Sequence, residues 1–183
     1  MSNISKMIED NKKFVENREY ERYTSSKYPQ KKIAILTCMD ARLTELLPAA
    51  LNLKNGDIKI IKNAGALITH PFGSVIRSLI VAVYELEVED IIVIGHYDCG
   101  MQGLDTNKLI KKMRNRGVSE ETIEIINCCG IDYHDWLKGF DSAELSVLES
   151  VDMIVKHPLI PDDIGVYGFM MNPETGELTQ LQQ

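Results

Sequence analysis

The stretch I-A-I-L-T-C-M-D-A-R-L, residues Ile33–Leu43, decides the fold. It begins with a short apolar run, which is typical of a buried strand, and it ends with Cys38, Asp40 and Arg42. These polar groups are costly to bury unless they are paired or bound to a ligand. Open α/β sheets carry their chemistry at the carboxyl ends of the strands. We therefore expect a functional site where this strand ends.

A second stretch repeats this layout. Asp90–Gly100 reads D-I-I-V-I-G-H-Y-D-C-G, an apolar run followed by His96 and Cys99. The nearly uninterrupted isoleucine and valine residues indicate a strand that is covered on both faces, as in a parallel sheet. The two strand ends are expected to bring two thiols and one imidazole together with Asp40 and Arg42.

Strand and helix patterns alternate along the rest of the chain. This alternation favours βαβ units and an α/β fold, with a mostly parallel central sheet flanked by helices. The other predicted strands are Ile58–Lys62 and Ile164–Met170. The predicted helices are Thr44–Leu53 (interrupted near Pro48), Ser74–Glu87, Thr106–Arg116, Glu120–Ile126 and Ser142–Lys156. A tight turn and a short tail are expected to follow the last strand, and a single domain is expected to span residues 1–183.

Residues 1–28 are predicted to form an N-terminal helical arm. Asn3–Arg22 contains no glycine or proline, and its apolar residues recur on one face, which indicates an amphipathic helix. The apolar face of this helix would cover either its own domain or a partner subunit. Both alternatives stay open at this level.

Charge and composition exclude several classes of protein. The net charge of −7 provides no basic surface for nucleic acid. No run approaches the roughly 20 apolar residues of a membrane span, and no signal-peptide pattern is visible. We therefore expect a cytoplasmic protein without nucleic-acid or membrane partners. Thiols stay reduced in that compartment, so the four cysteines favour metal binding or catalysis over disulfides.

Cys38, His96 and Cys99 are predicted to bind one metal ion. Thiolate and imidazole ligands suit zinc, and three protein ligands leave a fourth position open, as in catalytic zinc sites. The alternative is a strand end with incidental polar residues. Cys128 and Cys129 have no histidine or carboxylate at ligand spacing, and we interpret them as small buried apolar residues.

Asp40 and Arg42 add chemistry to this metal site. Residues two apart in an extended backbone point the same way, and an arginine keeps a neighbouring carboxylate ionised. Asp40 is then either a proton acceptor or a fourth metal ligand, and pairing with Arg42 keeps it off the metal. The alternative is a plain surface salt bridge. Because two thiolates neutralise a zinc dication, its water should be less acidic than at an all-histidine site, and activity should need alkaline conditions or help from Asp40.

Three motifs together resemble the β-class carbonic anhydrases. They are T-C-M-D-A-R at Thr37–Arg42, K-N-A-G-A at Lys62–Ala66 and G-H-Y-D-C-G-M at Gly95–Met101. The closing stretch Gly168–Leu178 is also similar, so the resemblance covers roughly Ile33–Leu178.

This resemblance implies a zinc ion on Cys38, His96 and Cys99, with Asp40 as fourth ligand in closed forms. It implies the reversible hydration of carbon dioxide to bicarbonate by zinc-bound hydroxide, assisted by the Asp40–Arg42 dyad. It also implies a homodimer or higher homo-oligomer, across which the N-terminal helix reaches. Gly65 is expected to place backbone near the substrate, although by local sequence it equally well terminates a strand.

Two other functions stay open on the same residues. The chain is short for this family, and compact members of the superfamily include hydrolases of carbonyl sulfide, so carbonyl sulfide or carbon disulfide is an alternative substrate. A non-catalytic, zinc-stabilised protein would keep Asp40 as a permanent fourth ligand. A thiol phosphatase or rhodanese is excluded because no phosphate-cradling loop lies between Cys38 and Arg42. A dinucleotide site is excluded because no G-x-G-x-x-G follows a strand.

Overall fold

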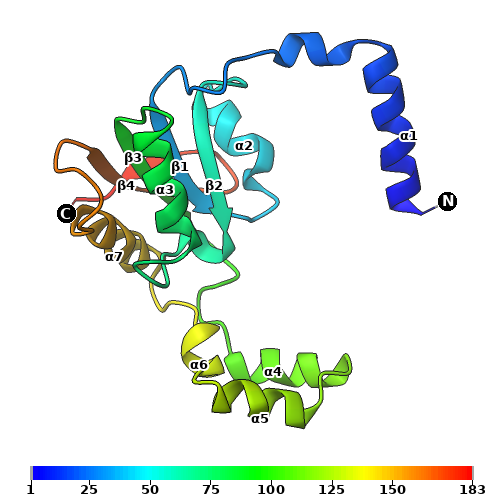
Figure 1. Cartoon of the computed structure of the whole chain (residues 1–183), viewed down its shortest axis with the longest axis vertical. Helices are drawn as coiled ribbons and strands as arrows, with labels where there is room; N and C mark the ends of the chain where they lie inside the picture. Colours follow the sequence, from blue (N-terminus) through cyan, green and yellow to red (C-terminus); the bar gives the residue numbers. More distant parts are fainter. Residues whose placement is uncertain (1, 183) are drawn as a thin grey trace.

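A five-stranded sheet forms the centre of the structure, a computed structural model that describes residues 2–182 (Figure 1). The strand order is β2-β1-β3-β4-β5. The strands are β1 Ile33–Cys38, β2 Ile58–Asn63, β3 Asp90–His96, β4 Gly165–Met171 and β5 Leu178–Gln180. The first four pair in parallel, and β5 pairs antiparallel with β4. The predicted α/β fold with a mostly parallel sheet is confirmed.

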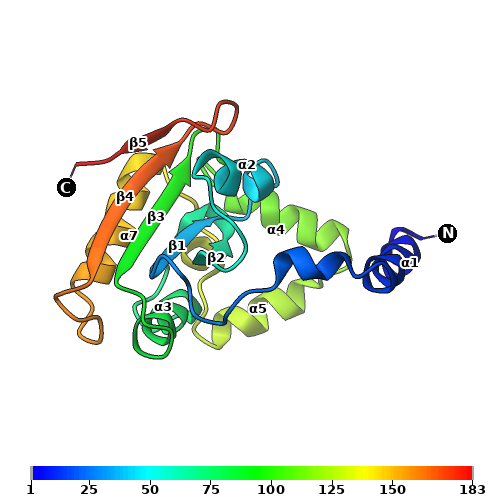
Figure 2. The same ribbon diagram turned by 90° about the horizontal axis from the view of Figure 1, so that it is seen from above.

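Helices cover both faces of this sheet (Figure 2). Helices α3 (Ser74–Tyr84) and α7 (Ala143–Val155) pack on one face against Leu36 and Val93. Helix α2 (Leu43–Ala50) packs on the other face against residues that include Ile35. Neighbouring residues of a strand therefore point to opposite apolar layers, which explains why the two central strands are almost continuously apolar.

Proline at position 48 does not interrupt α2, contrary to the prediction. The helix continues through Pro48 to Ala50. A proline within a helix leaves the carbonyl four residues earlier without its donor. That carbonyl belongs to Thr44, which is exposed to solvent. The loss is therefore tolerated, because water can satisfy an exposed carbonyl oxygen.

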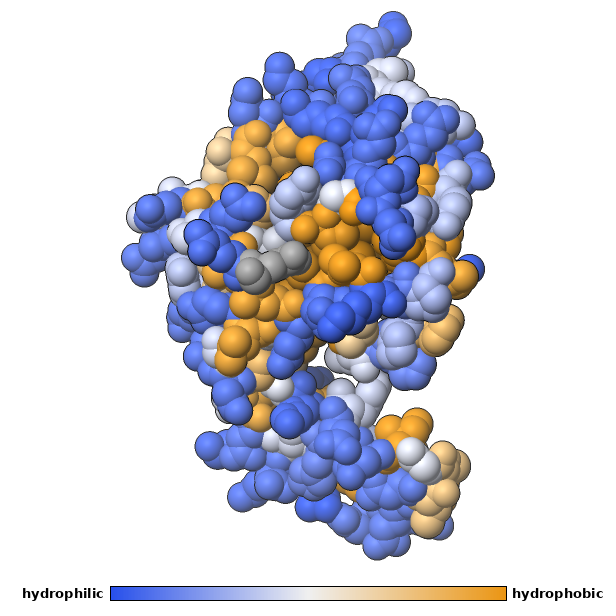
Figure 3. All heavy atoms as spheres, turned by 90° about the vertical axis from the view of Figure 1, so that its left-hand side faces the viewer, coloured by the Kyte–Doolittle hydropathy of each residue, from blue (hydrophilic) through white to orange (hydrophobic). Residues whose placement is uncertain are grey.

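Three short helices leave the sheet between Cys99 and Phe140. They are α4 Thr106–Asn115, α5 Glu120–Cys128 and α6 Tyr133–Trp136. A space-filling view shows them as a lobe below the body of the molecule (Figure 3). The neck of the lobe is closed by backbone hydrogen bonds from Gly103 N–H to the Phe140 carbonyl (2.9 Å) and from Phe140 N–H to the Met101 carbonyl (3.3 Å).

The lobe has only a small apolar core of its own, built on Ile110, Ile123 and Tyr133. Cys128 and Cys129 lie at the end of α5 and are exposed. The interpretation of these two cysteines as buried apolar residues is therefore wrong. The physical reason is that so small a core leaves most of α5 facing solvent.

The N-terminal arm extends away from the sheet (Figure 1). It comprises α1 (Asn3–Glu16) and a short 3₁₀ helix, η1 (Glu19–Tyr23). The predicted single helix over Asn3–Arg22 is broken at Arg18, whose φ of 57° is left-handed. No residue of α1 is buried. The apolar face of α1 therefore does not cover the protein's own domain, which was one of the two alternatives.

Three other elements were not predicted, one of which is the 3₁₀ helix η2 (Ala64–Ala66) directly after β2. Helix α6 is a single turn, and β5 lies in the expected tail. Within residues 2–182, no helix combines the length and the apolar character that crossing a bilayer requires.

Close packing of α7 on the sheet depends on glycine in β3. A Cβ atom at Gly95 would lie 2.6 Å from Val147 Cγ2 and 3.0 Å from Met170 Sδ. We therefore expect Gly95→Ala to lower the free energy of unfolding by about 1–3 kcal/mol, the usual cost of overpacking. Urea denaturation at one fixed protein concentration measures this change.

Val147→Ala provides the matched background for this test, because it removes the methyl group that the new Cβ would meet. The penalty of Gly95→Ala should be clearly smaller in that background. An equal penalty in both backgrounds would show that the contact with Val147 is not the cause.

Candidate metal centre

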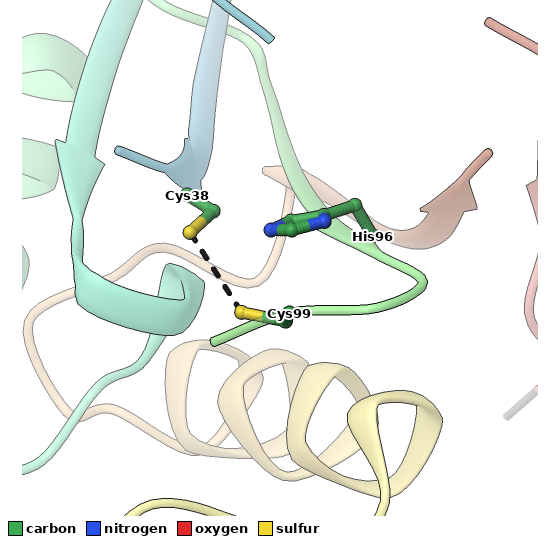
Figure 4. Close-up of side chains that lie close together, drawn as sticks. All are labelled: Cys38, His96 and Cys99. Carbon is green, nitrogen blue, oxygen red and sulfur yellow. Dashed lines mark hydrogen bonds between the residues drawn. The ribbon is translucent and has the colours of Figure 1, made fainter. Parts of the chain in front are cut away.

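Two parallel strands bring the three predicted ligands together. Cys38 is the last residue of β1, His96 is the last residue of β3, and Cys99 lies in the loop after β3. Figure 4 shows the three side chains converging. Their ligand atoms all lie within 4.8 Å of one another, the two sulfur atoms are 3.9 Å apart, and all three residues are buried. β1 and β3 are hydrogen-bonded neighbours in parallel register, so their carboxyl ends meet at one edge of the sheet.

The ring of His96 is oriented for metal binding. Its Nδ1 lies 2.9 Å from the carbonyl oxygen of Tyr97. Because a carbonyl oxygen only accepts, Nδ1 carries the proton and Nε2 is left with a free lone pair. Nε2 is buried and has no hydrogen-bond partner among the described residues. Metal-bound histidines usually donate their other N–H in this way, so a cation fits the unsatisfied nitrogen.

Burial acts differently on the two thiols. For Cys38, burial opposes ionisation, but the contact with His96 and the N–H of Gly65 lower the pKa below the usual value for a thiol. For Cys99, burial raises the pKa above the usual value. Two adjacent sulfurs in an apolar site are difficult to ionise together unless a cation neutralises them. Two thiols and one imidazole are the ligands that zinc prefers.

Arg42 holds Asp40 at the edge of this cluster. Its Nε donates to Asp40 Oδ1 at 3.1 Å, and its Nη2 donates to Oδ2 at 2.9 Å. These bonds lower the pKa of Asp40 to about 2, so it is a carboxylate near neutral pH. Asp40 Oδ2 lies 3.8 Å from His96 Nε2. The carboxylate is therefore next to the three metal donors but is engaged by arginine.

The two residues pair for a different reason from the one predicted. The backbone of Arg42 is helical rather than extended, with φ of −62° and ψ of −29°. Its own N–H donates to Asp40 Oδ1 at 2.9 Å. The pair is thus formed by a turn that leads into α2.

Gly65 places backbone directly beside the metal donors. Its N–H donates to Cys38 Sγ at 3.4 Å, and its φ of 84° is left-handed. A side chain here would press on Phe140, Met101 and Leu67 at 3.0–3.2 Å. The backbone of Gly65 thus lies against Cys38 at a position with little room for a side chain.

Asp98 also belongs to this site, although no sequence pattern indicated it. Arg42 Nη1 donates to Asp98 Oδ2 at 2.9 Å, and Arg42 Nη2 donates to the Asp98 carbonyl at 2.9 Å. The only local signal is the residue type, because aspartate is one of the few side chains that tolerate a left-handed backbone.

The fold and the site define a class of protein: α/β proteins with a candidate zinc centre of two thiols and one imidazole at the carboxyl edge of the sheet. The carbonic anhydrase family matches residues 33–178. This chain belongs to the β class of that family.

Known proteins resemble the chain over most of its length. A Bacillus subtilis protein named "Putative carbonic anhydrase YtiB" is 54% identical over 178 residues, which cover 97% of this chain and 95% of that protein. The crystal structure of β-carbonic anhydrase isoform I from Trichomonas vaginalis is 34% identical, with a TM-score of 0.89 over 98% of this chain and 97% of that chain. A carbon disulfide hydrolase of Saccharolobus solfataricus is 28% identical over 165 residues, which cover 84% of this chain and 78% of that protein.

The donor set predicts the metal content of purified protein. We expect one zinc ion per chain, and we expect Cys38→Ser to lose it because only two of the three donors remain. Elemental analysis after gel filtration measures the stoichiometry.

Cys128→Ser is the matched control, since it removes an exposed thiol that is remote from the donors. It should keep a full complement of zinc. Zinc that follows Cys128 rather than Cys38 would place the metal in the lobe and contradict the site described above.

Proposed function

We propose that this protein catalyses the reversible hydration of carbon dioxide to bicarbonate with zinc as cofactor. One observation carries the proposal: the buried Nε2 of His96 is unsatisfied and faces two thiols, beside a carboxylate that arginine holds in place. Cys38, His96 and Cys99 would hold the zinc ion. When bound, zinc would supply a Lewis acid that lowers the pKa of water towards neutrality.

In this proposal Asp40 and Arg42 are the catalytic pair. Asp40 is ionised, so it can accept a proton from the attacking water. Arg42 keeps the carboxylate away from the fourth metal position, because both carboxylate oxygens accept its hydrogen bonds. Gly65 is proposed to border the substrate with its backbone, since the absence of a side chain lets the chain lie against Cys38.

Hydrolysis of carbon disulfide or carbonyl sulfide is the second candidate. The similarity to a carbon disulfide hydrolase supports it, and the same three donors would serve. The non-catalytic alternative, with Asp40 closing the site, receives less support. Asp40 would first have to break its two side-chain hydrogen bonds to Arg42.

We also propose a homodimer or higher homo-oligomer in the cytoplasm. Four apolar side chains of α1 are exposed: Ile4, Met7, Ile8 and Val15. A second copy of the chain would remove them from water. The absence of disulfides among the four cysteines fits a reducing compartment.

Activity assays test the catalytic proposal. We expect the zinc-loaded protein to hydrate carbon dioxide and Asp40→Ala to lower kcat by roughly 100-fold or more, the usual contribution of a positioned general base. Stopped-flow measurement with a pH indicator gives the rate, and zinc content is measured on the same samples. An unchanged rate in Asp40→Ala with full zinc would remove Asp40 from the mechanism.

The same samples decide between substrates. Carbon disulfide and carbonyl sulfide are supplied in parallel, and sulfide release is measured. We expect sulfide to be negligible beside bicarbonate formation. A protein that releases sulfide but does not hydrate carbon dioxide would replace the first proposal by the second.

Removal of the arm tests the oligomer. We expect deletion of residues 2–23 to lower the molar mass in light scattering to that of one chain, because the apolar face of α1 is lost. Lys13→Gln breaks only the exposed salt bridge of Lys13 with Glu9 and serves as control. An unchanged mass after deletion would assign the interface to another surface.

A further inference from the structure

Arg42 joins the two loops that carry the metal donors. On one side it binds Asp40, which follows Cys38 at the end of β1. On the other side it binds both the carboxylate and the carbonyl oxygen of Asp98, which lies between His96 and Cys99. One guanidinium therefore spans the gap between two segments that are distant in sequence.

The backbone of Asp98 is in an uncommon conformation. Its φ is 54°, a left-handed value that only a few per cent of non-glycine residues adopt. The two hydrogen bonds from Arg42 hold this turn in place. This turn sets the direction in which the chain passes from His96 to Cys99.

Contacts with both aspartates restrict Arg42 as well. Its guanidinium is planar and presents five N–H donors in fixed directions. Four hydrogen bonds use these donors: two go to Asp40 and two go to Asp98. The group cannot turn towards solvent without losing contacts on both sides, although its side chain is 40% exposed.

We propose that Asp98 is a positioning residue for the metal site, which fixes Arg42 in the orientation that holds Asp40 away from the fourth metal position. The inference rests on the proposed metal site and extends it to a residue outside the Asp40–Arg42 pair. The side chain of Asp98 is 87% exposed, against 19% for that of Asp40. Asp98 therefore acts through Arg42 and not by contact with the metal donors.

Cobalt(II) in place of zinc provides a readout that does not need catalysis. Its visible spectrum reports the ligands around the metal, and added thiocyanate reports whether the fourth position is open. We expect Asp98→Gly to weaken thiocyanate binding by about two- to fivefold, which is the usual worth of an exposed ion pair. Glycine suits the left-handed turn, so this variant tests the carboxylate and not backbone strain.

Asp98→Asn keeps the shape of the side chain and an oxygen acceptor, and it should have a smaller effect than Asp98→Gly. Asp152→Asn is the matched control, because it removes a carboxylate from an exposed salt bridge with Lys156 on α7. It should bind thiocyanate as the unaltered protein does. A urea titration first checks that Asp98→Gly is folded. If it is not, thiocyanate binding is compared between the unaltered protein and Asp98→Asn.

A double-mutant cycle separates positioning from a local effect. In an Arg42→Ala background, Asp98→Gly should no longer change thiocyanate binding, since its route to Asp40 is gone. An effect of equal size in both backgrounds, or wild-type binding in Asp98→Gly, would overturn the inference. A protein that fails to hydrate carbon dioxide but shows the expected cycle overturns only the proposed function. Failure to bind cobalt at all overturns both.

Discussion

The burial of three donor atoms is the constraint on which the rest of the site depends. Cys38, His96 and Cys99 are almost inaccessible to solvent, and the free nitrogen of His96 has no partner among the described residues. An unpaired polar atom in such a place costs more than an ordinary hydrogen bond gains. A single dication would satisfy all three donors at once, which makes metal binding the simplest physical account of their arrangement.

The pairing of two strands in the parallel sheet brings the three donors together. β1 and β3 are adjacent and in register, so residues at their carboxyl ends meet although they are far apart in sequence. Apolar layers on both faces fix the strands, and Gly95 lets α7 approach closely just before His96. The geometry of the donors is thus set by the densely packed centre of the fold, while the arm and the helical lobe project from it (Figure 1).

The sequence was sufficient where a signal is local and repeated. Apolar patterns predicted the four parallel strands, and the polar residues at the ends of β1 and β3 predicted the donor set. The errors have physical causes. Strand β5 has only three residues and exists because it pairs with β4, and the break at Arg18 needs a left-handed residue that no glycine signals. Residue type alone suggested burial for Cys128, but burial depends on the size of the core around it.

The contact between Arg42 and Asp98 was beyond any local pattern, yet it explains why the position suits arginine. A lysine ammonium is a compact point charge and could neutralise either aspartate. A lysine ammonium has only three donors, so it could not bind both carboxylate oxygens of Asp40 together with the carbonyl and the carboxylate of Asp98. The guanidinium does so with one rigid group. The site therefore depends on the planar shape of the Arg42 guanidinium as well as on its positive charge. The loop that contains Asp98 fixes the guanidinium, and the guanidinium in its place fixes Asp40.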